Sequence, residues 1–381
     1  MARRFDARQP NAMTLRILAA SLLSLTTASQ AQGNPDPISW HDARTLTIEG
    51  QGWTETKAPY DRLPAAAEGV VRTPVWRLSR HSSGIAVRFL TDAPALHVRW
   101  TLTSDRLAMP HMPATGASGL DLYCRDGDGR WRWMAVAIPS TGDQQPERTH
   151  LARLFDGRSR QQREYMLYLP LYNGVESVSL GAPEDCEVRA APTRSARPIV
   201  FYGTSITQGG CASRPGMTHS AILGRRLERP VINLGFSGNG RMEPEVAGLL
   251  AELDAAIFVI DCLPNMTGEQ VKNRVESLVR IVRDARGNTP ILLVEDRTYQ
   301  DSWWSERRRS RNTQSRDELR RSYDQMVAGQ VLHLHYVHGD ELLGDDGEAT
   351  VDGSHPTDLG FFRQAAILER AIAPLIGGEP R

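Results

Sequence analysis

Residues 198–210, which read PIVFYGTSITQGG, decide the fold of this chain. Four apolar residues, 199–202, precede a turn of small residues that carries Ser205. An apolar run that ends at turn residues predicts a strand buried on both faces, as in a parallel sheet. Ligands of open α/β sheets bind at the carboxyl ends of the strands. We therefore take Ser205 as a candidate nucleophile at such an edge.

The sequence after this stretch alternates between apolar runs and helical patterns. Such alternation predicts an α/β fold, in which helices cover both faces of a parallel sheet. Pro215 and Pro244 suit the first turns of helices, and Thr267 with Gln270 forms a capping box. The further strands are expected at residues 231–234, 255–260, 291–294 and 332–337.

The sequence before this stretch has a different rhythm, with apolar and polar residues alternating in short runs. Alternation with period two and frequent turns predicts an all-β sandwich. Its strands are expected at residues 70–78, 85–89, 96–102, 119–124, 131–138 and 165–171. A polar, proline-bounded linker, 191–198, then separates the sandwich, 38–190, from the α/β domain, 199–377.

The N-terminal residues 1–31 have the pattern of a secretory signal peptide. Four arginines precede an apolar stretch at 17–25, and Ser29-Gln30-Ala31 fits a signal-peptidase site. The apolar stretch is too short to span a membrane. We therefore expect an exported protein, periplasmic or secreted.

Charge and cysteine content narrow the function classes further. The chain has 45 Lys and Arg residues and 45 Asp and Glu residues, so we expect no nucleic-acid partner. Export permits disulfides, and pairing Cys124 with Cys186 and Cys211 with Cys262 would keep each bridge within one domain. Four buried free thiols are the alternative, and the sequence does not decide between them.

Four polar features fall where strands of the α/β domain should end. They are Ser205, Gly238 in NLGFSGNG (233–240), Asn265 in DCLPNM (261–266), and Asp352 with His355 in DGSHP (352–356). Each alone is more often a turn or capping residue. Together they provide a hydroxyl, a backbone N–H donor, an amide donor, and an imidazole oriented by a carboxylate, which are the groups that acyl transfer requires.

The order of these four blocks resembles that of the SGNH (GDSL-like) hydrolase superfamily. Thr204 stands where the family more often has Asp, and Pro264 precedes Asn265 where Gly-x-Asn-Asp is commoner. A subgroup with such variants carries an N-terminal β-domain with a Gly-x-Asp-Leu-Tyr motif, which residues 119–123 match. The resemblance implies a flavodoxin-like three-layer hydrolase domain preceded by the sandwich.

The resemblance also implies the residue roles. Ser205 would be the nucleophile, His355 the base and Asp352 its orienting group. The N–H groups of Ser205 and Gly238 and the Asn265 amide would form the oxyanion hole, without metal or organic cofactor. The expected substrate is an O-acyl ester, acetyl above all, of a carbohydrate or other small molecule. A lipase-like or thioesterase-like hydrolase and an inactive carbohydrate-binding protein are the alternatives.

Two other stretches bear on substrate binding. Trp303 and Trp304 follow the expected strand 291–294 and either bind sugar rings or acyl chains, or anchor the next helix. Residues 109–113, MPHMP, form a proline-rich loop of the sandwich, and whether it reaches the site is left open. His333 and His335 have the spacing of metal ligands, but without a third ligand we expect no metal site.

Overall fold

The computed structural model describes residues 37–140 and 148–377. The expected signal peptide, 1–31, lies outside these residues. The described residues from 37 onward belong to one compact unit, so the domain boundaries near 190 and 199 stay predictions. In the part of the chain that is described, no helix is long and apolar enough to cross a membrane.

The C-terminal half is built on a parallel sheet. Its strands, within the described residues, are β11 (Ile199–Gly203), β12 (Val231–Gly235), β13 (Ile257–Asp261), β14 (Ile291–Val294) and β15 (Leu334–Val337). Their order in the sheet is β12-β11-β13-β14-β15, which is the flavodoxin-like order. The register aligns Gly203 of β11 with Gly235 of β12 and Asp261 of β13. The predicted fold is confirmed, and these three strand ends are neighbours.

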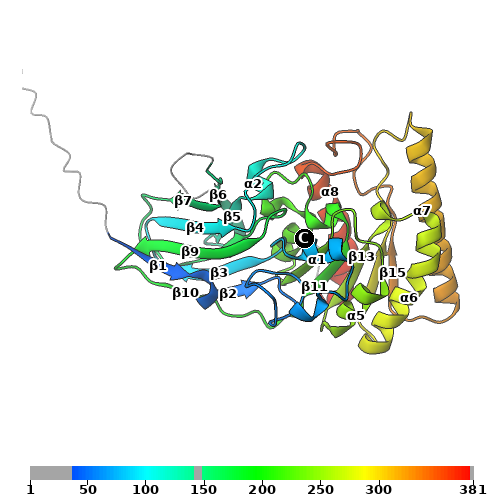
Figure 1. Cartoon of the computed structure of the whole chain (residues 1–381), viewed down its shortest axis with the longest axis horizontal. Coiled ribbons are helices and arrows are strands. Elements are labelled where there is room, and N and C mark those ends of the chain that lie inside the picture. The colour runs from blue at the N-terminus through cyan, green and yellow to red at the C-terminus, as the bar shows by residue number, and fades with distance from the viewer. Residues whose placement is uncertain (1–36, 141–147, 378–381) are drawn as a thin grey trace, which may run out of the picture. The chain divides into compact units, whose positions relative to one another are not determined.

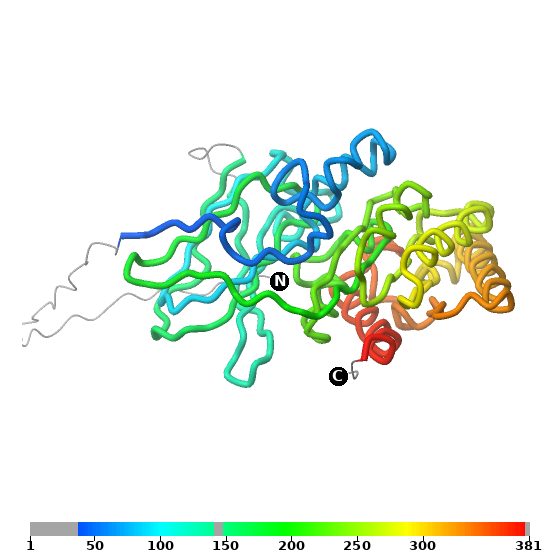
Figure 2. The backbone as a smooth tube through the Cα atoms, turned by 90° about the horizontal axis from the view of Figure 1, so that it is seen from below, coloured from blue at the N-terminus to red at the C-terminus, as the bar shows by residue number. Residues whose placement is uncertain are grey.

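Helices cover both faces of this sheet (Figure 1). They are α4 (His219–Arg226), α5 (Pro244–Glu252), α6 (Gly268–Arg286), α7 (Glu306–Ala328) and α8 (Asp358–Ile372). Val200 and Tyr202 pack in one core with α5, α6 and α7, whereas Ile199 and Phe201 pack in another with α4 and α8. Figures 1 and 2 both show α6 and α7, in yellow and orange, side by side. Both faces of β11 are therefore buried, which explains why its side chains are apolar on both faces.

The predicted helix starts are confirmed in two of three cases. Pro244 lies in the first turn of α5, and Thr267 and Gln270 form the capping box of α6. Pro215 instead begins a short 3-10 helix, η3 (Pro215–Met217), and α4 starts later with Thr218 as its N-cap.

The N-terminal half is the predicted antiparallel β-domain. One sheet has the order β1-β9-β4-β7, and the other β10-β3-β8-β5-β6 with β2 paired to β3. Inward side chains of both sheets, such as Trp100, Leu167 and Leu180, form a single core. The strands are β1 (Ile38–Asp42), β2 (Thr47–Glu49), β3 (Ala86–Thr91), β4 (Leu96–Leu102), β5 (Leu120–Arg125), β6 (Trp131–Ala137), β7 (Thr149–Phe155), β8 (Arg163–Tyr168), β9 (Val175–Pro183) and β10 (Val188–Ala190). Its short helical turns are η1 (Ala43–Thr45), η2 (Ala65–Ala67) and α2 (Ala114–Ala117), whereas η5 (Ala373–Ile376) follows α8 in the C-terminal half.

The strand predicted at residues 70–78 is wrong, because this segment contains a helix, α1 (Thr73–Ser79). Pro74 lies in the first turn, where its missing N–H removes no helical hydrogen bond. Val71 and Val75 are buried in the core beside the parallel sheet, and their spacing of four suits a helix as well as a strand.

The structure has the free thiols, one of the two alternatives that the sequence leaves open, since all four cysteines are free and buried. Cys262 packs in the core on one face of the parallel sheet, whereas Cys211 lies in the loop after the nucleophile. Burial raises the pKa of Cys211 to about 12, so this thiol stays protonated at neutral pH. The four thiols act as small apolar side chains.

The Gly-x-Asp-Leu-Tyr motif, residues 119–123, binds the β-domain to the parallel-sheet half. Asp121, fully buried on β5, accepts hydrogen bonds from Arg214 Nη1 and the Gly216 N–H, both at 2.8 Å. Tyr123 accepts a second bond from Arg214 Nη1 at 2.6 Å. A Cβ on Gly216 would lie 2.4 Å from the Tyr123 ring, so only glycine allows this approach.

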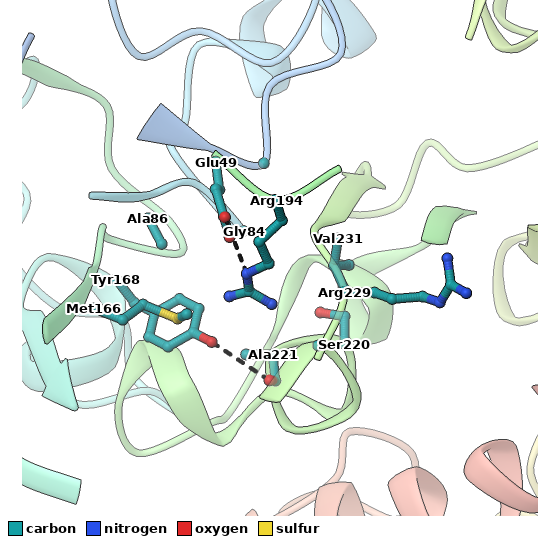
Figure 3. A pocket seen from close by; sticks show the side chains of 12 residues that line it. Glu49, Gly84, Ala86, Met166, Tyr168, Arg194, Ser220, Ala221, Arg229 and Val231 are labelled. Atoms are coloured by element: carbon teal, nitrogen blue, oxygen red, sulfur yellow. Dashed lines mark hydrogen bonds and ion pairs between the residues drawn. The ribbon is translucent and has the colours of Figure 1, made fainter. Parts of the chain in front are cut away.

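A small cavity lies between the two halves, away from the predicted site (Figure 3). Arg194 extends from the segment before β11 to Glu49 of β2, with a nitrogen–oxygen distance of 3.1 Å. Tyr168 donates its hydroxyl to the Ala221 carbonyl at 3.5 Å. None of the predicted site residues line this cavity, so it belongs to the contact between the halves.

Candidate active site

The candidate nucleophile lies at the C-terminal end of β11, as the sequence predicts. Thr204 caps the short helix α3 (Ser205–Gln208) by accepting a hydrogen bond from the Ile206 N–H at 3.3 Å. Gly203 has no space for a side chain, because a Cβ would lie 2.1 Å from Thr207 Oγ1. This tight turn leaves Ser205 only 8% exposed.

Asp352 and His355 meet Ser205 in one chain of hydrogen bonds. Ser205 Oγ lies 2.8 Å from His355 Nε2, and His355 Nδ1 lies 2.7 Å from Asp352 Oδ2. Pairing of Thr350 with Pro356 closes the loop that carries the acid and the base. Gly353, at φ +86°, makes the turn that an L side chain would strain.

The carboxyl group of Asp352 is held in its ionised form. Burial raises its pKa, but hydrogen bonds from the side chain and backbone of His355, and from the Ser354 N–H, outweigh this effect. The net result is a pKa well below the usual value for Asp. An ionised Asp352 fixes the proton of His355 on Nδ1, which leaves Nε2 able to accept one from Ser205.

Gly238 and Asn265 follow the two strands that flank β11. Gly238, at φ +70°, is part of a turn in which the N–H groups of Asn239 and Gly240 both donate to the Phe236 carbonyl. Asn265 ends the 3-10 helix η4 (Leu263–Asn265), and its Oδ1 accepts from the Gly240 N–H at 3.3 Å. Among the described residues, neither the Gly238 N–H nor Asn265 Nδ2 has an acceptor. Both donors are therefore available to a ligand.

The β-domain supplies residues that sequence reasoning missed. Tyr172 donates its hydroxyl to the Ser205 carbonyl at 3.2 Å. His111 packs its ring 5.8 Å from that of His355, so the loop 109–113 does reach the site. The proline-rich composition of that loop was a signal for His111, but nothing in the sequence marks Tyr172.

Gln208 links the nucleophile helix to both the β-domain and the Gly238 turn. Its Nε2 donates to the Leu171 carbonyl at 3.0 Å and lies 3.1 Å from His81 Nδ1. Its Oε1 accepts from the Ser237 N–H at 3.0 Å. One buried amide thus sets the distance between the nucleophile helix and the residue before Gly238.

Arg62 supports the strand end that precedes the turn of Gly238. Its guanidinium, almost wholly buried, donates to the carbonyls of His81, Asn233 and Gly235 at 2.8, 3.1 and 2.7 Å. It also lies over the Phe236 ring, 5.1 Å from the centroid. Burial lowers the pKa of Arg62 to about 9, which still leaves it charged at neutral pH.

Trp303 and Trp304 lie on the surface, 80% and 67% exposed, so they do not anchor the following helix. Their turn is tied to the loop of Asp352 and His355, because the Gln300 N–H donates to the Gly353 carbonyl at 2.9 Å. In residues 37–140 and 148–377, no three His, Cys, Asp or Glu side chains are grouped as a metal site would need.

Comparison with known proteins identifies related sequences for both halves. The model of the GDSL-like lipase/acylhydrolase family matches residues 196–373, and that of the N-terminus of SGNH-hydrolase-type esterases matches 38–188. The comparison with curated proteins gives no match.

Solved structures agree with these matches. A protein described as a GDSL-like lipase from Bacteroides ovatus ATCC 8483 is 32% identical, with a TM-score of 0.85, over 91% of this chain and 100% of that one. The salicylyl-acyltransferase SsfX3 of a tetracycline biosynthetic pathway is 18% identical, with a TM-score of 0.69, over 89% and 97%. A family two carbohydrate esterase from Clostridium thermocellum is 14% identical, with a TM-score of 0.56, over 77% and 93%.

The last two structures, at these identities, show a shared fold alone. The first, together with the two family models, shows more, because the similarity covers both the β-domain and the parallel-sheet domain. The chain belongs to the GDSL-like lipase/acylhydrolase (SGNH) family of serine hydrolases.

Proposed function

We propose that this chain is a serine esterase that removes O-acyl groups, acetyl above all, from a carbohydrate or other small molecule. The observation that supports this most is the continuous chain Ser205–His355–Asp352, with distances of 2.8 and 2.7 Å. A hydroxyl is a weak nucleophile until an oriented base accepts its proton, and these contacts provide that base.

In the first half of the reaction, Ser205 Oγ attacks the ester carbonyl carbon and its proton passes to His355 Nε2. The oxygen of the tetrahedral intermediate gains a negative charge, which the N–H groups of Ser205 and Gly238 and the Asn265 amide stabilise. Each such donor contributes about 100-fold to 1,000-fold in rate. The intermediate collapses when His355 gives its proton to the departing alcohol, which leaves an acyl group on Ser205.

In the second half, water replaces the alcohol. His355 takes a proton from the water, whose oxygen attacks the acyl carbon, and the same three donors hold the second oxyanion. The proton then returns to Ser205 Oγ as the carboxylic acid leaves. No other co-reactant is needed, because water and the ester supply all the atoms of the products.

The preference for a carbohydrate rests on Trp303 and Trp304. Exposed aromatic faces beside a catalytic loop suit the apolar faces of sugar rings, and these two side chains are among the most exposed large apolar residues described. A carbohydrate esterase among the similar structures is consistent with this preference. Export, expected from residues 1–31, would give the enzyme access to glycans outside the cytoplasm.

Hydrolysis of 4-nitrophenyl acetate by the protein and by two variants tests the mechanism. We expect Ser205→Ala and His355→Ala each to lower kcat at least about 1,000-fold, because the hydroxyl and its base act as one unit. Ser195→Ala, the same change at an exposed serine before β11, is the matched control and should keep full activity. Absence of turnover by the unaltered protein, or undiminished turnover by both variants, would refute the mechanism.

Acyl-chain length and the nature of the alcohol separate the remaining alternatives. Acetate esters should be hydrolysed faster than octanoate esters, and acetate should be released from a panel of acetylated glycans. Faster hydrolysis of the octanoate ester would indicate a lipase instead. Glycan binding without any ester hydrolysis would indicate a carbohydrate-binding protein.

A further inference from the structure

A cavity of about 450 Å³ lies between Tyr172 and the turn that carries Gly238, and the β-domain forms most of its wall. Tyr172 lines this cavity and also donates its hydroxyl to the Ser205 carbonyl. Ser237 and Asn239, the neighbours of Gly238, complete the wall on the hydrolase side. The cavity is therefore separated from the Ser205 backbone by one side chain, Tyr172, and it adjoins both neighbours of Gly238. Its volume is within the usual range for a small-molecule site.

The charge of the cavity wall is positive. Arg77 of α1 and Arg106 of the segment after β4 both line it, and no carboxylate does. The neighbouring arginines are neutralised, since Arg72 pairs with Glu243 and Arg80 with Asp61. Within the described residues, the guanidinium groups of Arg77 and Arg106 contact no acid and make no hydrogen bond. Two cations are thus left without a counter-charge at the wall.

His81 adds a neutral donor to the same wall. Burial, with the charge of Arg62 nearby, lowers the pKa of His81 to about 4, so the imidazole is uncharged at neutral pH. Gln208 uses its Nε2 for the Leu171 carbonyl and His81 Nδ1, and its Oε1 for the Ser237 N–H. Because His81 Nδ1 accepts a hydrogen bond from Gln208 Nε2, the imidazole carries its proton on Nε2. This N–H can be donated to a hydroxyl or carboxylate.

We propose that this cavity binds the alcohol part of the substrate, and that Arg77 and Arg106 bind a carboxylate on it. The preferred substrates are then acetyl esters of acidic sugars. An acetyl group would fill only a small part of the cavity, whereas a sugar ring fits its volume. Guanidinium groups bind carboxylates through paired, charge-assisted hydrogen bonds. This inference rests on the proposed esterase function and adds a substrate class to it.

A matched pair of substrates tests the proposal. One is a mono-O-acetyl methyl glucuronoside, and the other is the same regioisomer of the methyl glucoside, which replaces the carboxylate by CH₂OH. We expect kcat/KM for acetate release to be at least about tenfold higher for the glucuronoside, because charge-assisted bonds are stronger than neutral ones. Raising the salt concentration should reduce this ratio.

Variants assign the preference to the two arginines. The double variant Arg77→Gln/Arg106→Gln should lose the tenfold preference and should hydrolyse the glucoside and 4-nitrophenyl acetate within about twofold of the unaltered protein. Arg130→Gln, at an exposed turn between β5 and β6, is the control and should keep the preference. Arg77 and Arg106 are both exposed, so replacing them should not prevent folding.

Three results would overturn the proposal while leaving the esterase function intact. The first is equal kcat/KM for the two sugars. The second is that the double variant retains the preference, or that it hydrolyses both sugars more slowly by the same factor. The third is a preference for mono-4-nitrophenyl succinate over the butyrate ester that depends on the arginines, which would place the anion on the acyl part. If 4-nitrophenyl acetate is not hydrolysed at all, the esterase function itself fails.

Discussion

At the scale of single residues, Arg62 is the side chain on which the Gly238 turn most depends. It is a buried cation whose hydrogen-bond acceptors are backbone carbonyls, and two of them belong to β12 just before that turn. Its partner groups would be left unsatisfied by any shorter side chain. Arg62 is therefore a positioning residue, since it touches no reacting atom.

We expect Arg62→Met to lower kcat for 4-nitrophenyl acetate at least about tenfold with a change in KM under about twofold. A displaced oxyanion donor affects the transition state more than the bound ester, which is why kcat should carry the effect. Steady-state kinetics measures it, with Arg99→Met, an exposed β4 arginine stacked on Trp40, as the control. A rise in KM at constant kcat would show that Arg62 acts on substrate binding instead.

At the scale of elements, β5 joins the two halves through Asp121. This carboxylate is fully buried and its ion pair with Arg214 is 2.8 Å long, so removing it leaves the Arg214 cation without its counter-charge and the Gly216 N–H without an acceptor. Asp121→Ala should lower the free energy of unfolding by about 2 to 4 kcal/mol. Urea unfolding measures this loss, and Asp128→Ala, in the exposed turn after β5, should cost less than about 0.5 kcal/mol. Equal losses for the two variants would contradict the fastening role.

At the scale of the whole molecule, His219 makes stability sensitive to acid. Its ring is fully buried between Phe361 and Phe201, and neither ring nitrogen has a hydrogen-bond partner in the described part of the chain. Burial, with a smaller effect of Arg297, lowers its pKa to about 3. The unfolded chain binds a proton near pH 6.5 and the folded one does not, so stability falls as pH drops below 6.5.

Between pH 7 and pH 4.5, we expect His219→Phe to lose roughly 2 to 3 kcal/mol less unfolding free energy than the unaltered protein. Phenylalanine keeps the ring contacts and removes the titrating group. Urea unfolding at the two pH values gives the difference, and His333→Asn, at an exposed histidine, should behave like the unaltered protein. Parallel losses for His219→Phe and the unaltered protein would exclude this role.

The strand-helix alternation and the order of the four blocks were enough to predict the parallel sheet and to bring Ser205, Asp352 and His355 together. Three of the four motifs directly follow strands β11, β12 and β13, and parallel strands end at one edge of the sheet, whereas the motif of Asp352 and His355 precedes α8. Arg62, His81 and Tyr172 could not be found in this way, since each reaches the site only when two halves of the chain pack together. The segment 70–78 was misassigned because Val71 and Val75 fit both periods, and Pro74 decides for the helix.

Most of the cavity wall and the nucleophile come from different halves of the chain, so substrate selection and the reaction itself can change separately. Ser205, Gly238 and Asn265 follow strand ends of the parallel sheet, whereas most residues that line the cavity come from α1, the β4–β5 connection and Tyr172 of the β-domain. Substitutions at positions such as 77 and 106 can thus change which ester is selected without shifting the nucleophile. Libraries that vary only these β-domain positions offer a route to new selectivity on an unchanged reaction centre.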